Sequence, residues 1–397
     1  MLKKLFKPKY VPYDHKYIEL SEQDERNIRT ITDDIKNYIS KSDKASGVDY
    51  HTRDAHAKGY CALKAKFEIL DNLPAEYAQG FYAKSGIHDA VIRFSNGASR
   101  VSADRELGLA QGLAIKVFDV PGEKLAPGEE DSSNFDFNLI NHPVFFCNRI
   151  EDYAYISKLF LEIPEYAKQG AVGKAKLAFN WLTNYGSKLP SKESLKTFKA
   201  LRGFTTIEPK NTLLYNFHSQ GVVRHGDYMA KIRVTPTKAS AQKITRREVD
   251  IAAKEEAIRP LIINEIREHD YQFDVQIQLC RNLKKQPIEE LTTEWQASDA
   301  PFVTVATITI PCQDVPDDGN FEVMENLSFT PFRCLEENRP IGNLQQSRLK
   351  AYQIASETRH ELNNVKRQEP KSLKQTFDKS FFYIDVQSFV LTVMSQL

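Results

Sequence analysis

Segments in which apolar and polar residues alternate, as in β-strands, recur along most of this chain. The helical segments lie between them in separate blocks. In residues 272–280, Phe273, Val275, Ile277 and Leu279 share one face, as expected of a strand with one side buried. Comparable segments lie at residues 65–70, 90–95, 112–118, 134–147, 228–234 and 302–310. About six to eight strands with grouped helices predict an α+β fold around an antiparallel sheet. The spacing alone does not distinguish a barrel from an open sheet.

The remaining long segments have the apolar spacing of helices. They are residues 21–45, 150–205, 246–268 and 343–367. We interpret the first as an exposed amphipathic helix and the second as an insertion between groups of strands. Pro260 is expected to kink or divide the third helix.

These segments predict one main domain with a short addition at each end. Residues 1–45 form an N-terminal arm and helix, residues 46–380 form the main domain, and residues 381–397 form an apolar tail. The tail is too short and too polar for a membrane span, so membrane association is not indicated. We expect it to be a terminal strand or a docking segment.

Charge and cysteine content exclude several classes of protein. The net charge of +1 gives no electrostatic reason to expect a nucleic-acid partner. The five cysteines are widely spaced and include no CxxC pair, which is typical of neither a disulfide framework nor a zinc site. The N-terminal residues lack the apolar run of a secretory signal. We therefore expect a reducing, cytoplasmic environment.

One histidine stands among small residues in the stretch Arg53-Asp54-Ala55-His56-Ala57-Lys58-Gly59. Short neighbours leave room for something flat to approach the imidazole. A lone histidine is more often a structural residue, so the rest of the chain has to show what His56 faces.

The segment at 343–367 has a second unusual feature. At about 100° per residue, Arg348, Tyr352 and Arg359 fall within about 40° on one helix face. A guanidinium one turn from a phenol favours the phenolate, which is a hard ligand suited to ferric iron. The alternative is a solvated face with extended arginines.

Five segments in the same order resemble the haem-dependent catalase superfamily. They are Arg53–Gly59 (R-x-x-H-A-K-G), Arg93–Ser95 (R-F-S), Gln111–Lys116 (R-G-x-A-x-K, with Gln in place of Arg), Asn141–Phe146 (N-N-x-P-x-F-F) and Arg348–Tyr352 with Arg359 beyond (R-x-x-x-Y). The short chain and the segment 216–228 are most similar to the small catalase-related haem peroxidases. The resemblance implies an antiparallel β-barrel of catalase type with helical insertions and no large C-terminal helical domain.

The resemblance also implies haem b as cofactor and a role for each matching residue. His56 would be the distal acid–base, Asn141 would donate a hydrogen bond to bound peroxide, and Ser95 would orient His56. Tyr352 would ligate the iron, with Arg348 holding it as phenolate. The other expected cofactor-binding residues are Arg53, Arg93 and Arg359 at the propionates, and Phe145, Phe146 and Tyr153 at the distal face, although core packing also explains these rings.

Besides Gln111, the sequence departs from the family pattern at three places. Counted back from Pro143, the counterpart of the family's catalytic asparagine is Ile140; we choose Asn141 because only it carries an amide. Ala55 replaces the valine that commonly precedes the distal histidine, which leaves a less crowded distal face. His142 is an additional histidine, for which we expect a supporting or surface role.

The expected function is a catalase or peroxidase that decomposes hydrogen peroxide or an organic or lipid hydroperoxide during oxidative stress. We expect a monomer or a homo-oligomer. One alternative is rearrangement of fatty-acid hydroperoxides, as in allene oxide synthases, whose pattern has a hydroxyl residue where this chain has Ala55. The other alternative is a haem-binding module without turnover.

Overall fold

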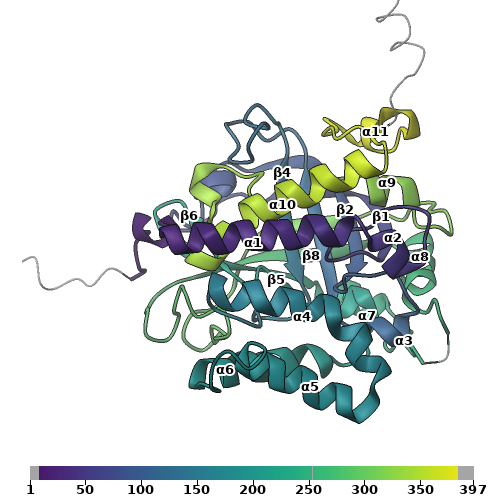
Figure 1. The fold of residues 1–397 in the computed structure, drawn as a ribbon. Coiled ribbons are helices and arrows are strands. Elements are labelled where there is room, and N and C mark those ends of the chain that lie inside the picture. The colour runs from purple at the N-terminus through teal and green to yellow at the C-terminus, as the bar shows by residue number, and fades with distance from the viewer. Residues whose placement is uncertain (1–8, 253, 383–397) are drawn as a thin grey trace, which may run out of the picture.

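The computed structural model describes residues 9–252 and 254–382 of the 397-residue chain. Eight antiparallel strands close into a barrel in the order β1–β2–β3–β4–β5–β7–β8–β9, with β9 pairing back to β1 (Figure 1). Two short strands, β6 and β10, extend the sheet beyond β7. The strands are β1 (Gly59–Ile69), β2 (Gly86–Asn96), β3 (Gln111–Val117), β4 (Phe135–Ile140), β5 (Phe217–His218), β6 (Val222–His225), β7 (Tyr228–Pro236), β8 (Tyr271–Leu279), β9 (Val303–Ile310) and β10 (Pro340–Ile341). The expected α+β fold with an antiparallel barrel is confirmed.

Apolar residues that alternate along the strands fill the barrel. Ile92, Ile115 and Phe137 are direct partners on β2, β3 and β4 and form one row of this core. Phe67 and Ile308 pair in the same way where β1 meets β9. Because strand side chains alternate with a period of two, the residues between these positions face outward.

Helices cover one side of the barrel (Figure 1). The long helices α1 and α10 lie side by side across it, and α4 runs along the other side of α1. The helices are α1 (Glu22–Ile39), α2 (Ser42–Ser46), α3 (Asp104–Leu107), α4 (Ile150–Lys168), α5 (Gly170–Thr183), α6 (Lys192–Thr205), α7 (Lys238–Lys243), α8 (Ile258–Glu268), α9 (Phe321–Asn326), α10 (Asn343–Leu362) and α11 (Leu373–Thr376). Short 3-10 turns lie at His15–Ile18, Gly80–Ala83, Thr212–Leu214, Glu336–Asn338 and Lys379–Phe382.

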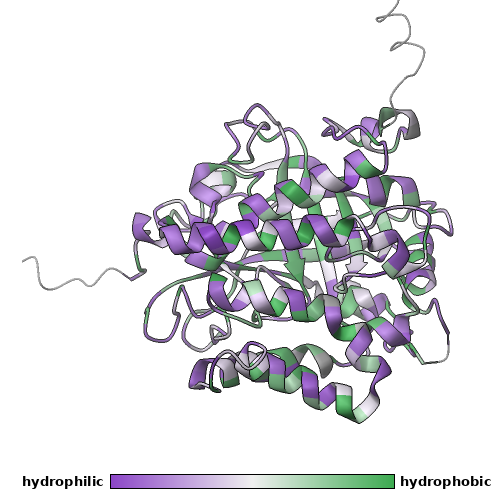
Figure 2. Cartoon of the chain, viewed as in Figure 1, coloured by the Kyte–Doolittle hydropathy of each residue, from purple (hydrophilic) through white to green (hydrophobic). Residues whose placement is uncertain are grey.

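The helix α1 is amphipathic, and its apolar side is buried rather than exposed. Ile28, Ile31, Ile35 and Ile39 pack in a second core with residues of α4. Figure 2 shows the mixed colouring of α1 and α10 in front of strands that are mainly hydrophobic. The insertion expected at residues 150–205 consists of α4, α5 and α6.

The helix expected over residues 246–268 is only half as long. Among the described residues of this segment, helix begins at Ile258, so Pro260 lies in the first turn and causes no kink. A proline is tolerated there because the first N–H groups of a helix have no partner within it. The distant Asp104 supplies that partner, since its carboxylate accepts from the N–H groups of Ala257 and Ile258 at 2.8 and 3.0 Å. Local sequence contains no sign of this cap.

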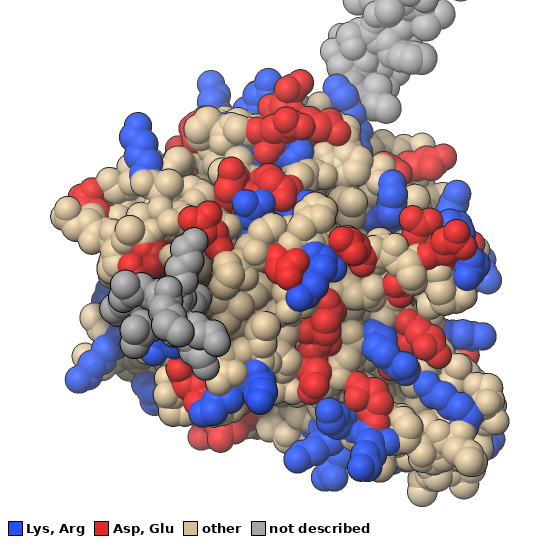
Figure 3. All heavy atoms as spheres, turned by 90° about the vertical axis from the view of Figure 1, so that its left-hand side faces the viewer, with Lys and Arg blue, Asp and Glu red and all other residues tan. Residues whose placement is uncertain are grey.

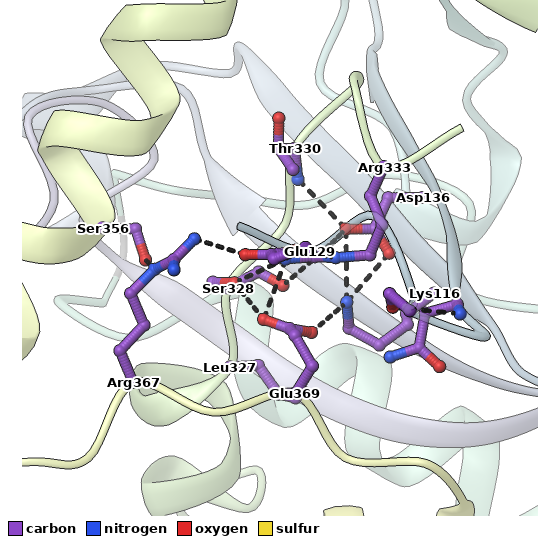
Figure 4. Close-up of polar contacts among 12 residues, drawn as sticks. Lys116, Glu129, Asp136, Leu327, Ser328, Thr330, Arg333, Ser356, Arg367 and Glu369 are labelled. Atoms are coloured by element: carbon purple, nitrogen blue, oxygen red, sulfur yellow. Dashed lines mark hydrogen bonds and ion pairs between the residues drawn. The ribbon is translucent and has the colours of Figure 1, made fainter. Parts of the chain in front are cut away.

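A buried network of charged side chains fastens the segment that follows α10 to the barrel (Figure 4). Its members are Lys116, Asp136, Arg333, Glu129, Glu369 and Arg367. Lys116 and Asp136 are direct partners on β3 and β4, with Nζ and Oδ1 2.9 Å apart and no exposed side-chain surface. Arg333 pairs with both Asp136 and Glu369. Three cations face three carboxylates, and this balance is what makes their burial tolerable.

The network also responds to acid. Although burial alone would raise it, the charges of Arg333 and Lys116 lower the pKa of Glu369 to about 2. A carboxyl whose pKa falls on folding stabilises the folded state above its ordinary pKa of 4.5, and this contribution is lost as the pH falls towards 2.

The tail expected at residues 381–397 lies largely outside the described residues, which end at 382. Within the described ranges 9–252 and 254–382, no helix is both long enough and apolar enough to cross a membrane.

We predict that Arg333→Met lowers the free energy of unfolding by about 3–5 kcal/mol, because removal of one partner leaves buried carboxylates uncompensated. Urea denaturation followed by tryptophan fluorescence measures this change. Arg26→Met is the control, since Arg26 pairs with Glu22 on the surface with 53% of its side chain exposed, and it should be nearly neutral. A similar loss of unfolding free energy in both variants would show that burial does not make the Arg333 ion pairs more important than a surface pair.

Candidate functional site

His56 lies in the loop between α2 and β1. Its φ of 57° is in the left-handed region, which costs a non-glycine residue about 1–2 kcal/mol. Two contacts hold the loop in this conformation. Arg93 donates to the carbonyl of His56 at 3.0 Å, and the buried Lys58 pairs with Asp104 at 2.7 Å. The same carboxylate caps α8, so Asp104 ties the histidine loop to the body of the fold.

The imidazole of His56 lies against β3 at Gly112. Its Nδ1 atom is 3.2 Å from the hydroxyl oxygen of Ser95. A Cβ at position 112 would lie 2.5 Å from two atoms of the imidazole, so glycine is required there. Burial, with a further contribution from Arg93, lowers the pKa of His56 to about 4. The imidazole is therefore neutral near pH 7 and can accept a proton.

Strand register determines which residue shares this face with the imidazole. Ser95, Gly112 and Ile140 are direct partners across β2, β3 and β4. Directly paired residues of antiparallel strands project to the same face of the sheet. Because His56 contacts the positions of Ser95 and Gly112, Ile140 shares this face of the sheet with the imidazole, and so does His218, the direct partner of Ile140 on β5.

Asn141, which the sequence suggested as a peroxide donor, is engaged elsewhere. Its Oδ1 atom accepts from the N–H of Gln111 at 2.7 Å, and its Nδ2 atom donates to the carbonyl of Leu109 at 2.9 Å. Its side chain joins two backbone segments, as is common for a buried amide. The geometry does not support a role for Asn141 beside His56.

The next row of paired residues on the outer face is Arg93, Ala114 and Asn138. Ala114 and Asn138 keep part of their surface accessible, although core residues flank them on the strands. The Oδ1 atom of Asn138 is buried and has no hydrogen-bond partner among the described residues. Asn138, Gln345 and Arg348 line one pocket together with residues of the barrel core such as Phe137 and Ile277.

Helix α10 carries Arg348, Tyr352 and Arg359, as the sequence suggested. Arg348 donates to the Tyr352 hydroxyl oxygen at 2.9 Å and to the Gln345 side chain at 2.8 Å. Tyr352, Ser356 and other residues of α10 line a small pocket with Arg367 of the ion network.

Three arginines from distant parts of the chain converge on α9. Arg53 pairs with Glu325 at 2.7 Å, and Arg93 approaches the other carboxylate oxygen at 3.4 Å. Arg359 donates to the backbone carbonyls of Glu325 and Leu327. Although burial alone would raise it, the three guanidinium groups hold the pKa of Glu325 below its usual value.

This arginine cluster carries more positive charge than its carboxylate can neutralise. Two guanidinium groups contact the carboxylate of Glu325 and a third contacts its backbone carbonyl, and Arg93 and Arg359 are each only 3% exposed. Burial, with a contribution from Arg53, lowers the pKa of Arg93 to about 9 and that of Arg359 well below its usual value. The buried Nε atom of Arg93 has no partner among the described residues. Asp54 is the other nearby carboxyl, and burial raises its pKa to about 6.

Three aromatic side chains pack together at and just before the start of α4. The rings of Phe145 and Phe146 are 4.0 Å apart between centroids, and Tyr153 lies 5.8 Å from Phe145. Burial raises the pKa of Tyr153, and the nearby carboxyl of Asp54 contributes to the rise. Tyr153 lies near both the histidine loop and α10. All three rings keep part of their surface accessible.

No protein-family model matches the chain, and no curated protein sequence is significantly similar to it. Solved structures are similar at low sequence identity. A fungal catalase has a TM-score of 0.59 and 15% identity, covering 84% of this chain and 62% of its own. Catalase A from Saccharomyces cerevisiae has a TM-score of 0.56 and 17% identity, covering 91% and 70%. A bacterial catalase has a TM-score of 0.52 and 15% identity, covering 82% and 62%.

This chain has the catalase-type fold. At these identities the likeness establishes the fold alone. The chain spans about six tenths of the length of the fungal and bacterial catalases that it matches.

The structure adds residues to the candidate site beyond those chosen from the sequence. Glu325 gathers the three arginines, and Asp104 anchors the histidine loop through Lys58. Gly112 accommodates the imidazole, and Ile140 and His218 share its face of the sheet. Glu325 and Asp104 lie in segments without a periodic pattern or motif of their own, so no sequence signal could have found them.

We predict that Gly112→Ala displaces the imidazole of His56, because the new Cβ would lie 2.5 Å from two ring atoms. The histidine signals in an NMR spectrum should shift for His56 while the fold is retained. Gly86→Ala is the matched control on β2, since the nearest atom to its added Cβ is 3.8 Å away. Unchanged His56 signals in Gly112→Ala would contradict the close packing.

We also predict that His56 titrates with a midpoint of about 4 in the folded protein, because its charged form is disfavoured by burial and by Arg93. A histidine with a depressed pKa stays neutral as the pH falls and becomes protonated only near that value. NMR titration of the imidazole checks this, with the exposed His15 as an internal reference. A midpoint for His56 near the ordinary histidine value of 6.5 would contradict the burial of its imidazole.

Proposed function

We propose that this protein binds haem b against the outer face of β2–β4 and α10 and uses it to reduce peroxides. The observation that carries the proposal is the arginine cluster. Arg53, Arg93 and Arg359 are gathered at one buried place around a single carboxylate. Buried charges are ordinarily paired, so this cluster calls for further anionic groups.

Haem b fits this charge pattern. Its two propionates would give further anionic partners to guanidinium groups whose charge exceeds that of Glu325. The unpartnered Nε atom of Arg93 gives one donor for them, and guanidinium groups bind carboxylates in forked geometry. The incompletely covered side chains of Ala114, Asn138 and Tyr153 give the flat macrocycle surfaces to pack against.

Tyr352 is the residue that we propose as iron ligand. Its phenol oxygen is already bonded to Arg348, which favours the phenolate that ferric iron prefers. Among the described residues, no group of three or more His, Cys, Asp or Glu side chains could hold a metal ion. A single phenolate instead suits an iron that a porphyrin already holds.

When bound, haem would supply the redox chemistry, passing two electrons to the peroxide and recovering them from a second peroxide or an organic donor. The chain would move the protons. The neutral imidazole of His56 would take a proton from one peroxide oxygen and deliver it to the other as the O–O bond breaks. Ser95 and Gly112 would keep the imidazole in the orientation that this transfer needs.

Hydrogen peroxide or an organic hydroperoxide fits the charge distribution as substrate. On the face shown in Figure 3, positive and negative side chains are interspersed, with no single-sign field for a polyanion. All five cysteines are free, as expected in the reducing, cytoplasmic setting that we propose.

We predict that His56→Ala lowers the rate of peroxide consumption about 10²–10⁴-fold while the haem stays bound, because positioned proton transfer is lost. Tyr352→Phe should weaken haem retention and alter the ferric spectrum, because the iron loses its ligand. A peroxide assay and the optical spectrum of the purified protein measure these effects.

The matched controls are His15→Ala and Tyr185→Phe, whose side chains are exposed. Both should resemble the wild type. Normal turnover in His56→Ala would remove the proposed acid–base, and a wild-type spectrum in Tyr352→Phe would place the iron ligand elsewhere. Absence of haem from the wild-type protein would overturn the proposal as a whole.

A further inference from the structure

We infer that the layer formed by α5 and α6 docks on the surface of a membrane that contains anionic phospholipids. Such docking goes beyond the proposed function and does not depend on haem. Residues 170–205, which form this layer, combine an excess of positive charge with exposed apolar side chains. The expectation drawn from the C-terminal tail concerned a segment that spans a membrane, whereas docking on the surface needs none.

The first feature of this layer is its charge. Residues 170–205 contain seven Lys or Arg side chains and one Glu, a formal charge of +6, whereas the whole chain has +1. The basic residues are Lys174, Lys176, Lys188, Lys192, Lys196, Lys199 and Arg202. Among the described residues, Lys174, Lys192 and Lys199 have no carboxylate partner, and all three are exposed. The balanced composition of the whole chain conceals this local excess.

The second feature is exposed apolar surface. In the described part of the chain nine large apolar side chains are exposed, and five of them belong to this short segment. They are Val172, Phe179, Tyr185, Leu189 and Leu195. Leu189, in the connection between the two helices, is 86% exposed, and Phe179 is 57% exposed. Single exposed apolar residues are ordinary, but their concentration in one segment indicates an interaction surface.

Basic and apolar side chains share one side of each helix. At about 100° per residue, Lys192, Leu195 and Lys199 fall within about 60° of one another on α6. Val172, Lys176 and Phe179 fall within about 60° on α5 in the same way. Lysines interleaved with large apolar residues are typical of helices that lie in the plane of a membrane surface.

The other sides of both helices are buried against one core. Leu177 and Trp181 of α5 and Phe198 of α6 pack there with residues of α1 and α4. The indole of Trp181 donates to the Thr197 hydroxyl at 3.2 Å and joins the two helices. Figure 1 shows both helices at the lower edge of the molecule, on the far side of α4 from α1. Their basic and apolar sides therefore form the outer surface of this layer.

An anionic lipid surface matches this combination better than other partners. Two copies of the layer would carry the same charge, which opposes self-association. A nucleic acid would match the lysines and leave Phe179 and Leu189 in water. A lipid surface offers phosphate and carboxylate groups to the lysines, and the apolar side chains enter the boundary between headgroups and acyl chains.

The test is co-sedimentation of the purified full chain with phospholipid vesicles. Phosphatidylcholine vesicles with about one third phosphatidylserine should bind the protein at least tenfold more tightly than vesicles of phosphatidylcholine alone. Raising the salt concentration from about 0.1 M to about 0.5 M should weaken this binding, because counterions screen the lysines. Absence of binding, or equal binding to both kinds of vesicle, would overturn the proposal.

Charge reversal tests the basic side chains. Lys192→Glu combined with Lys199→Glu should weaken binding to the anionic vesicles at least tenfold, because the new carboxylates repel the headgroups. The matched control is Lys371→Glu combined with Lys374→Glu. Both of these lysines are exposed, and α11, at which they lie, is at the opposite edge of the molecule in Figure 1. This control should bind like the wild type.

A second pair of substitutions tests the apolar side chains. Phe179→Ser combined with Leu189→Ser should weaken binding at least fivefold, because the apolar side chains no longer enter the lipid. Ile87→Ser combined with Leu283→Ser is the matched control, since Ile87 and Leu283 are 68% and 40% exposed outside this layer. Circular dichroism confirms that each variant is folded. The two tests change different residues, so either one decides the matter if the other variant fails to fold.

The remaining outcomes would also overturn the proposal. Undiminished vesicle binding in both test variants would place the lipid contact in another part of the chain. A wild-type dimer that the Phe179→Ser and Leu189→Ser substitutions dissociate, seen by sedimentation velocity, would assign the surface to a second copy. Tighter binding of duplex DNA than of anionic vesicles would assign it to nucleic acid. None of these results depends on haem binding or peroxide turnover, so the proposed function is tested separately.

Discussion

The pairing register of β2, β3 and β4 is the constraint on which the rest of this structure depends. It directs Ile92, Ile115 and Phe137 into the barrel and leaves Gly112 and Ile140 on the outer face. A slip of one residue would exchange the two faces, moving core residues outward and burying small and polar ones. The register that directs apolar side chains into the barrel therefore also determines that Gly112 lies against the imidazole of His56.

Two buried groups of charges on this outer side serve different purposes. Around Arg333, three cations face three carboxylates, so the network is complete and holds the segment after α10 in place. Around Glu325, two guanidinium groups share one carboxylate and a third bonds the backbone, and one of their nitrogen atoms has no partner in the described ranges. Burial makes an unbalanced cluster costly, so the imbalance is evidence for an anionic ligand, whereas the balanced network is evidence for stability alone.

Sequence reasoning succeeded where local pattern and burial agree. The alternation at 272–280 and the isoleucines of α1 each predicted an element that the structure contains. It failed where a distant residue decides the outcome. The helix expected from residue 246 begins at Ile258, because Asp104 caps it there. The strands β5, β6 and β10 have two to four residues, too few for a pattern to be recognised.

By itself, the sequence determined the class of fold, the segment that carries His56 and the helix that brings Arg348 and Tyr352 together. These features depend on neighbours within a few positions, which period and motif reveal. Only the tertiary structure decided that Ile140 rather than Asn141 shares a face of the sheet with the histidine, and that Arg53, Arg93 and Arg359 meet at Glu325. Such facts depend on strand register and on contacts between residues far apart in the chain, and a linear pattern contains no record of either.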